Sequence, residues 1–172
     1  DLAVLSATAT WAYPPSASSV TVHYSSVTLS WSPNSNHGGT TYYAEVSTTG
    51  FGASTTAQFT LNTSLKFASL AANTTYQVRV KAVNHRSVSS SYDASLTTST
   101  LAMGPTAALY TGVTASQVTA NWGANGNGRT QYRVVFSSDG FVTQRASDTY
   151  EAWAAFGGWA KARTLGASDS TA

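Results

Sequence analysis

The sequence predicts an all-β protein made of two successive antiparallel β-sandwiches, the second of which lacks its last strand. Two observations support this fold class. Apolar and hydroxyl-bearing residues alternate with a period of two, and clusters of Gly, Asn and Pro separate the alternating stretches. In addition, one pattern of about ninety residues occurs twice in the chain. No convincing amphipathic helix is predicted before residue 150.

The repeat sets the expected domain boundaries. Pro15 and Pro105 are 90 residues apart in similar surroundings, and Trp31 and Trp122, each closing an alternating segment, are 91 apart. A period of this length is that of one small domain. We therefore expect a last-strand-like segment at residues 1–13, a complete domain at 14–101 and an incomplete domain at 102–172.

Seven strands are expected in the complete domain, which is the number that one sandwich needs. Val27, Leu29 and Trp31 lie on one side of their strand, while the residues between them carry hydroxyl groups. The expected strands lie near Ser18–Val22, Ser26–Ser32, Thr41–Ser47, Ala57–Leu61, Ser64–Phe67, Thr75–Val83 and Tyr92–Thr98.

The core signature resembles that of fibronectin type III domains, of the kind found as tandem repeats in bacterial exported and surface proteins. Trp31 stands where the family has its core tryptophan, and Trp122 would be its partner in the second module. Leu70 lies six residues before Tyr76, the spacing with which the family begins its sixth strand. The resemblance implies that the Tyr76 hydroxyl ties down the preceding corner. The resemblance says little about function, because domains of this family serve as spacers, adhesive modules and filament subunits.

The N-terminal segment aligns with the last strand of the first full module when 90 is added to its residue numbers. One side of this segment carries Ala3, Leu5, Ala7, Ala9 and Trp11. The second module, by the same offset, stops near the close of its sixth strand, because 172 − 90 = 82. One hypothesis is that residues 1–12 of one copy complete the second module of a neighbour, which would produce a head-to-tail polymer. The other is that the 172 residues are a window of a longer covalent array.

The composition excludes several classes of function. Charged residues make up 9% of the chain, the net charge is +2, and the nine Lys and Arg residues are scattered, which argues against nucleic-acid binding. There is no cysteine and no apolar run of membrane-spanning length. The histidines have no ligand spacing, and the seven acids form no paired carboxylate site. We therefore expect no metal, no cofactor and no catalytic residue.

Two sets of residues suggest contacts with sugars. Trp153 and Trp159 lie in a tail where the repeat pattern fades, and they would serve either as a sugar-stacking platform or, as we favour, in packing. Asn62 and Asn73 begin formal N-glycosylation triplets, which arise readily by chance in a chain rich in Thr and Asn.

The sequence therefore favours a non-catalytic structural subunit of an extracellular filament, sheath or surface stalk. Its expected partners are copies of itself or flanking repeats, with glycans as a further expectation. The alternative is a carbohydrate- or surface-binding accessory module of a secreted multidomain protein. The expected location is extracellular, at the surface of a bacterial cell.

Overall fold

The computed structural model describes residues 9–115, 117–127, 130–137, 140–142, 145–150 and 163–166. All regular structure in these ranges is β-strand, and every strand pairing is antiparallel. The chain divides into two compact units. Unit 1 comprises residues 1–70 and 74–101, and unit 2 comprises residues 71–73 and 102–172.

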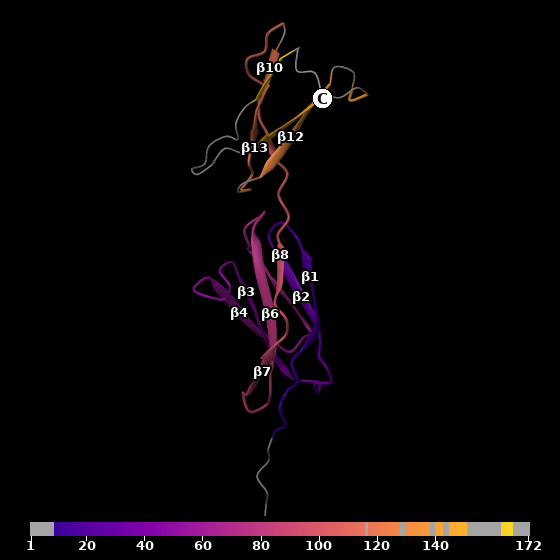
Figure 1. Ribbon diagram of the computed structural model, residues 1–172, viewed down its shortest axis with the longest axis vertical. Coiled ribbons are helices and arrows are strands. Elements are labelled where there is room, and N and C mark those ends of the chain that lie inside the picture. The colour runs from indigo at the N-terminus through magenta and orange to yellow at the C-terminus, as the bar shows by residue number, and fades with distance from the viewer. Residues whose placement is uncertain are drawn as a thin grey trace, which may run out of the picture. The chain divides into compact units, whose positions relative to one another are not determined.

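Unit 1 is a sandwich of two sheets (Figure 1). The smaller sheet has the order β1-β2-β5, and the larger has the order β4-β3-β6-β7, with β8 also paired to β6. The strands are β1 (Ser16–Val22), β2 (Val27–Ser32), β3 (Thr41–Ser47), β4 (Thr55–Thr60), β5 (Ser64–Phe67), β6 (Thr75–Val83), β7 (Ser89–Tyr92) and β8 (Leu96–Ser99).

The core of unit 1 lies between the two sheets and follows the period-two pattern. On β2, Val27 and Leu29 are fully buried and Trp31 is 6% exposed. On β6, every second residue from Tyr76 to Ala82 is buried, and the residues between them are partly exposed. Burial of such side chains contributes about 1.5–3 kcal/mol each, which makes this face the main source of stability.

Six of the seven expected strands of unit 1 are present near their expected positions, and the seventh is divided. The sequence predicts one last strand at Tyr92–Thr98, whereas the structure has β7 and β8 with residues 93–95 between them. The break has a physical cause in Asp93. Its backbone N–H donates to Val80 O at 2.9 Å, while its carboxylate turns toward Ser18 on β1.

Unit 2 has described strands that correspond to those of the first half of unit 1. They are β9 (Thr106–Ala107), β10 (Gln117–Ala120), β11 (Trp122–Gly123), β12 (Gln131–Phe136), β13 (Arg145–Tyr150) and β14 (Arg163–Gly166). β9 pairs with β11, β12 pairs with β13, and β10 pairs with β14. The pairings repeat those of β1 with β2, β3 with β4, and β2 with β5.

The position of β14 corrects one interpretation of the sequence. By a constant offset of 90, Arg163 would lie near the start of the sixth strand, yet it begins β14 and pairs with Ala120, as the fifth strand of unit 1 pairs with β2. Val27 pairs with Phe67 and Val118 with Leu165, so the offset at this strand is 165 − 67 = 98.

The offset grows because the connection between β13 and β14 is longer than its counterpart. Residues 151–162 separate β13 from β14, whereas only residues 61–63 separate β4 from β5. In the described part of unit 2, no strand corresponds to β6, β7 or β8. Among its described strands, unit 2 thus has counterparts of β1 to β5 only, and the constant offset of 90 does not hold beyond β13.

Candidate functional site: an asparagine clamp at the entry of each unit

The chain segment that enters unit 1 is held by two asparagines of the loop between β2 and β3. Asn36 Oδ1 accepts a hydrogen bond from Tyr13 N, and Asn36 Nδ2 donates to Tyr13 O, both at 2.8 Å. Asn34 Nδ2 donates to Pro14 O at 2.9 Å. The Asn36 amide thus pairs with the Tyr13 backbone much as a neighbouring strand would. We call Asn34 and Asn36 the unit 1 clamp.

Unit 2 carries the same arrangement at the corresponding positions. Asn127 Oδ1 accepts from Met103 N at 2.7 Å, and Asn127 Nδ2 donates to Met103 O at 2.6 Å. Asn125 Nδ2 donates to Gly104 O at 2.8 Å. The asparagines lie 91 residues after Asn34 and Asn36, because 125 − 34 and 127 − 36 both equal 91. We call Asn125 and Asn127 the unit 2 clamp.

The clamp geometry follows from the backbone of its loop. Asn34 and Ser35 have φ of 51° and 64°, and Asn125 and Gly126 have φ of 53° and 79°. Asn and Gly adopt this left-handed conformation more readily than other residues, which explains why Asn occupies the first of the two left-handed positions in both loops. The resulting turn directs both amides toward the entering segment.

A buried tyrosine supports each clamp from the sandwich side. The pKa of Tyr42 is raised by burial, and a hydrogen bond with the Asn36 side chain opposes this rise. In unit 2, Asn127 Nδ2 lies 3.5 Å from the Tyr132 hydroxyl, which itself donates to Ala124 O at 3.1 Å. Each tyrosine also packs on the core tryptophan, with ring centroids 5.4 Å apart for Trp31 and Tyr42 and 5.8 Å apart for Trp122 and Tyr132. The clamps are thus anchored in the two cores.

The sequence pattern marks these loops only as Gly- and Asn-rich separators between strands and does not reveal their role. A further contact, from Asn84 Nδ2 to Thr10 O at 3.0 Å, holds the entering segment of unit 1 three residues earlier. The signal that would have found the clamps is the Asn-x-Asn spacing, which recurs at an offset of 91.

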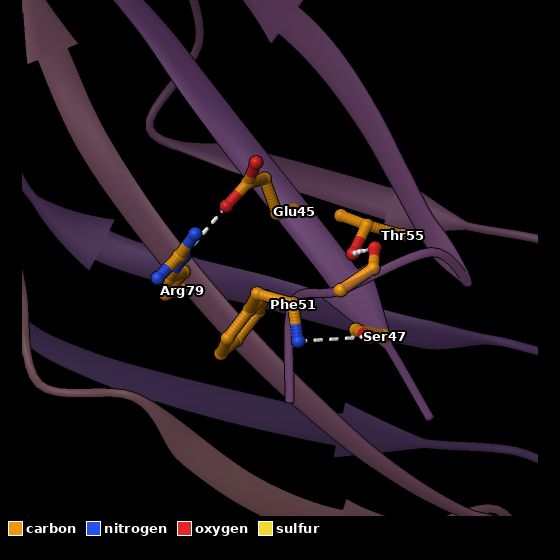
Figure 2. A network of polar contacts seen from close by, with 6 residues as sticks. Glu45, Ser47, Phe51, Thr55 and Arg79 are labelled. Atoms are coloured by element: carbon orange, nitrogen blue, oxygen red, sulfur yellow. Dashed lines mark hydrogen bonds and ion pairs between the residues drawn. The ribbon is translucent and has the colours of Figure 1, made fainter. Parts of the chain in front are cut away.

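A second cluster lies on the outer face of the larger sheet of unit 1 (Figure 2). Glu45 on β3 and Arg79 on β6 are directly opposite in the strand register, and Arg79 Nε lies 2.5 Å from Glu45 Oε2. The Arg79 guanidinium lies between the rings of Phe51 and Tyr92, 3.9 Å from each centroid. Glu45 is 7% exposed, so its carboxylate is largely shielded from water, whereas the Arg79 side chain is 27% exposed.

The tyrosines next to this ion pair are affected by it. Burial raises the pKa of Tyr92, and the hydrogen bond and charge of Glu45 raise it further, while Arg79 lowers it. Burial and then Glu45 raise the pKa of Tyr43 in the same direction. Lys81 Nζ lies 5.0 Å from the Tyr43 ring and 4.9 Å from the Tyr92 ring. These cation–ring contacts join β3, β6 and β7 and so stabilise the larger sheet.

The turn between β3 and β4 supports the same face and is repeated in unit 2. Phe51 N donates to Ser47 Oγ at 3.0 Å, and Phe141 N donates to Ser137 Oγ at 2.9 Å. Figure 2 shows how this bond directs the Phe51 ring toward Arg79. Phe51 and Phe141 have φ of 65° and 68°. The turn is thus the third feature, after the clamp and the Trp–Tyr pair, that has matching geometry in both units.

The core signature residues lie where the sequence places them. Trp31 and Trp122 are buried at 6% and 8% exposed, and the indole Nε1 of each has no hydrogen-bond partner in the described structure. Tyr76 is buried at 8% exposed, and Leu70 is half-buried against the unit 1 core. The tie between the Tyr76 hydroxyl and its corner stays a prediction.

The other predicted site residues are only partly within the described ranges. Ala3, Leu5 and Ala7 of the assembly strand lie outside them; Ala9 is half-buried, Trp11 is 80% exposed, and neither is in a strand. Trp153 and Trp159 also lie outside the described residues. Of the glycosylation triplets, Asn62 is exposed just after β4, and Asn73 is half-buried in the turn before β6. The assembly, sugar and glycan roles stay predictions.

Among the described side chains, no group of three or more His, Asp or Glu residues could hold a metal ion. The two acids of unit 1 in the described ranges, Glu45 and Asp93, are engaged separately, with Arg79 and with Ser18. The described ranges also hold no helix of the length and apolarity that a membrane span needs.

These features match a known family. The family model for the fibronectin type III domain matches residues 13–98, which is half of the chain. The chain belongs to the fibronectin type III family. The match begins at Tyr13, the residue that the unit 1 clamp binds. Domains of this family are typical of extracellular proteins and generally have structural or binding roles.

The chain is similar to several solved structures. A two-domain fibronectin type III segment of chicken tenascin is 16% identical, covers 88% of this chain and 82% of its own, and has a TM-score of 0.63. The fibronectin type III domain of the human collagen α-1(XX) chain is 20% identical and covers 58% of this chain and 94% of its own, with a TM-score of 0.48. Domains A168–A170 of titin are 27% identical over 54% of this chain and 33% of their own, with a TM-score of 0.45. No curated protein matches the chain at a significant level.

Proposed function

We propose that the chain is a non-catalytic structural segment of an extracellular array of fibronectin type III modules, joined covalently end to end in a stalk, sheath or filament. The observation that carries this proposal is the recurrence of the asparagine clamp. Each unit binds the backbone of the segment that enters it, through the same two asparagines and the same backbone atoms. Such a device suits a chain in which one module follows directly on another.

The connection between the units is short. Leu101 N donates to His23 O at 3.2 Å within unit 1, and Met103 is bound by Asn127 within unit 2. One residue, Ala102, separates these two attachments. A pull along the chain is therefore passed from the body of one module to the clamp of the next with little slack, which is what a load-bearing spacer requires.

Head-to-tail assembly by donation of residues 1–12 receives less support than the covalent array. In unit 1, β8 pairs with β6 and not with β3. A donated last strand would therefore need a sixth strand beside it, and the described part of unit 2 has no counterpart of β6. One donated segment supplies one strand, whereas unit 1 is completed by β6, β7 and β8 together.

The proposal is tested by stretching single molecules attached at both ends. We expect unit 1 to unfold in one cooperative step that releases about 30–32 nm of chain, given about 3.3–3.6 Å for each of its roughly 90 residues. The Asn36→Ala variant is expected to unfold at lower force than the control Asn62→Ala, whose side chain lies outside the clamp. Extension without a cooperative step, or equal forces for the two variants, would contradict a load-bearing role.

Electron microscopy separates the two forms of assembly. The covalent array predicts that the 172-residue chain and a chain starting at Tyr13 are both free of regular fibres. Regular fibres that disappear when residues 1–12 are removed would instead establish strand donation.

A further inference from the structure

β4 is an edge strand with an open side. Among the described strands it pairs with β3 alone, over six consecutive residue pairs and without a bulge. Alternate N–H and C=O groups of an edge strand point away from the sheet, where they can bind another strand. Thr56, Ala57 and Gln58 at the centre of β4 are all exposed, so neither face of the strand is covered.

The other edges of unit 1 have features that hinder such pairing. The register of β1 shifts between Ser16 and Ser19, and Ser18 N donates to the carboxylate of Asp93. β5 has only four residues and carries the exposed Lys66. The last edge is divided into β7 and β8. Bulges, charges and short strands are the usual means of blocking edge-to-edge association, and β4 has none of them.

The composition around β4 favours a second copy of the same strand as the partner. Residues 46–65, from the end of β3 to the middle of β5, contain no charged residue and no proline. When two copies of one strand pair about a two-fold axis, each charge lies near its own copy and is repelled by it. β4 brings no such repulsion to the contact.

Apolar side chains lie beside this edge. Phe59 is 65% exposed and packs against Tyr43 of β3 in a tilted arrangement, with ring centroids 4.8 Å apart. Leu61, just after the strand, is also 65% exposed. Both would lose contact with water when a second sheet is added at the edge, which adds a hydrophobic contribution to the backbone hydrogen bonds.

We propose that β4 of one chain pairs antiparallel with β4 of a second copy, about a two-fold axis, and joins the larger sheets of two unit 1 domains into one continuous sheet. This contact links chains side by side. It goes beyond the proposed array and does not depend on it, because the array concerns the connection along one chain.

Cysteine cross-linking tests the contact, since the chain has no cysteine of its own. Each residue of β4 is replaced by Cys in turn, and Thr21→Cys, at an exposed position of β1, is the matched control. Residues facing each other in antiparallel strands have Cα atoms about 4.5–5.5 Å apart, which suits a disulfide. We expect one β4 variant, or an equimolar mixture of two neighbouring variants, to form dimers at least about tenfold faster than Thr21→Cys.

Sedimentation equilibrium provides an independent test. The unmodified chain is expected to dimerise as its concentration rises toward the millimolar range, and Gln58→Lys to weaken dimerisation at least about tenfold by placing two like charges at the contact. Thr21→Lys is the control and should dimerise as the unmodified chain does. Both positions are exposed, and circular dichroism verifies that both variants fold. A chain that stays monomeric, or Lys variants that associate equally, would overturn the proposal, as would cross-linking no faster than that of Thr21→Cys.

Discussion

Replacing Asn36 with alanine removes most of the unit 1 clamp with one substitution. The side chain makes three hydrogen bonds to backbone atoms, to Tyr13 N and Tyr13 O at 2.8 Å and to Pro33 O at 2.7 Å. These bonds lie near the surface, so water can replace part of what is lost, and each contributes about 0.5–1 kcal/mol net. We expect unit 1 to lose about 2 kcal/mol of its free energy of unfolding, and its melting temperature to fall by about 10 °C.

The measurement must separate the two units. Urea unfolding followed by the amide resonances of Val78 and Val80 reports on the unit 1 core, because both residues are fully buried there. Hydrogen exchange of the Tyr13 amide reports on the clamp itself, and its protection should be lost. The control is Asn62→Ala, an exposed asparagine outside the clamp, with an expected change of less than about 0.5 kcal/mol. The matching variant Asn127→Ala should leave the unit 1 midpoint unchanged.

Two results would refute this reasoning. If Asn36→Ala costs no more than Asn62→Ala, the amide bonds to the entering segment add nothing to stability. If Asn36→Ala is costly but Tyr13 exchanges at its original rate, the asparagine acts only within its own loop, through its bond to Pro33.

Three further predictions concern unit 1. Burial and Glu45 raise the pKa of Tyr92 and Tyr43, so the unfolded chain ionises these groups first, near pH 10.0, and the stability they add is complete below that pH and lost as the pH rises through the folded-state pKa values. Urea midpoints between pH 8 and 11 should therefore fall less steeply in Tyr92→Phe, and a slope equal to that of the unmodified chain would contradict this prediction. Arg79→Met should cost about 2 kcal/mol, more than the double variant that also carries Glu45→Gln, because the single change leaves a buried carboxylate without its ion partner; equal costs would contradict this. Calorimetry should show that Trp31→Phe lowers the free energy of unfolding by about 1 kcal/mol and Trp31→Ala by about 3–5 kcal/mol, because the phenyl ring keeps most of the packing and also removes a buried N–H that has no acceptor. Similar losses for the two variants would argue against a cost of that N–H.

The parts of the fold that depend on local alternation could be predicted from the sequence. β3, β5 and β6 have the bounds that the pattern predicts, and Trp31 and Tyr76 are buried as their resemblance to the family implies. Successive residues of a strand point to opposite faces, so the alternation of apolar and polar residues is enough to predict which of them face the core.

The clamp and the divided last strand could not be predicted in this way. Both depend on hydrogen bonds between residues far apart in the chain: Asn36 and Tyr13 are 23 positions apart, and Asp93 and Ser18 are 75 apart. Asn-rich loops are common as turns, so composition alone does not separate a turn from a turn that also binds another segment. The repetition of the spacing in unit 2 was the available clue.

The long connection in unit 2 explains why the offset argument failed there and bears on how that unit is completed. β14 pairs with β10 as β5 pairs with β2, so residues 151–162 lengthen the connection without changing the order of the first five strands. In unit 1, the next strand, β6, pairs with β3 over seven residues and also with β7 and β8, and so forms the centre of the larger sheet. The corresponding side of β12 has no partner among the described strands. In a continuing polypeptide the counterpart of β6 would come first and those of β7 and β8 would follow it, which is the order in which they pair in the sheet. A separate donor strand that corresponds to β8 would have no counterpart of β6 to pair with in the described part of unit 2. The same geometry that corrects the offset therefore favours the covalent array.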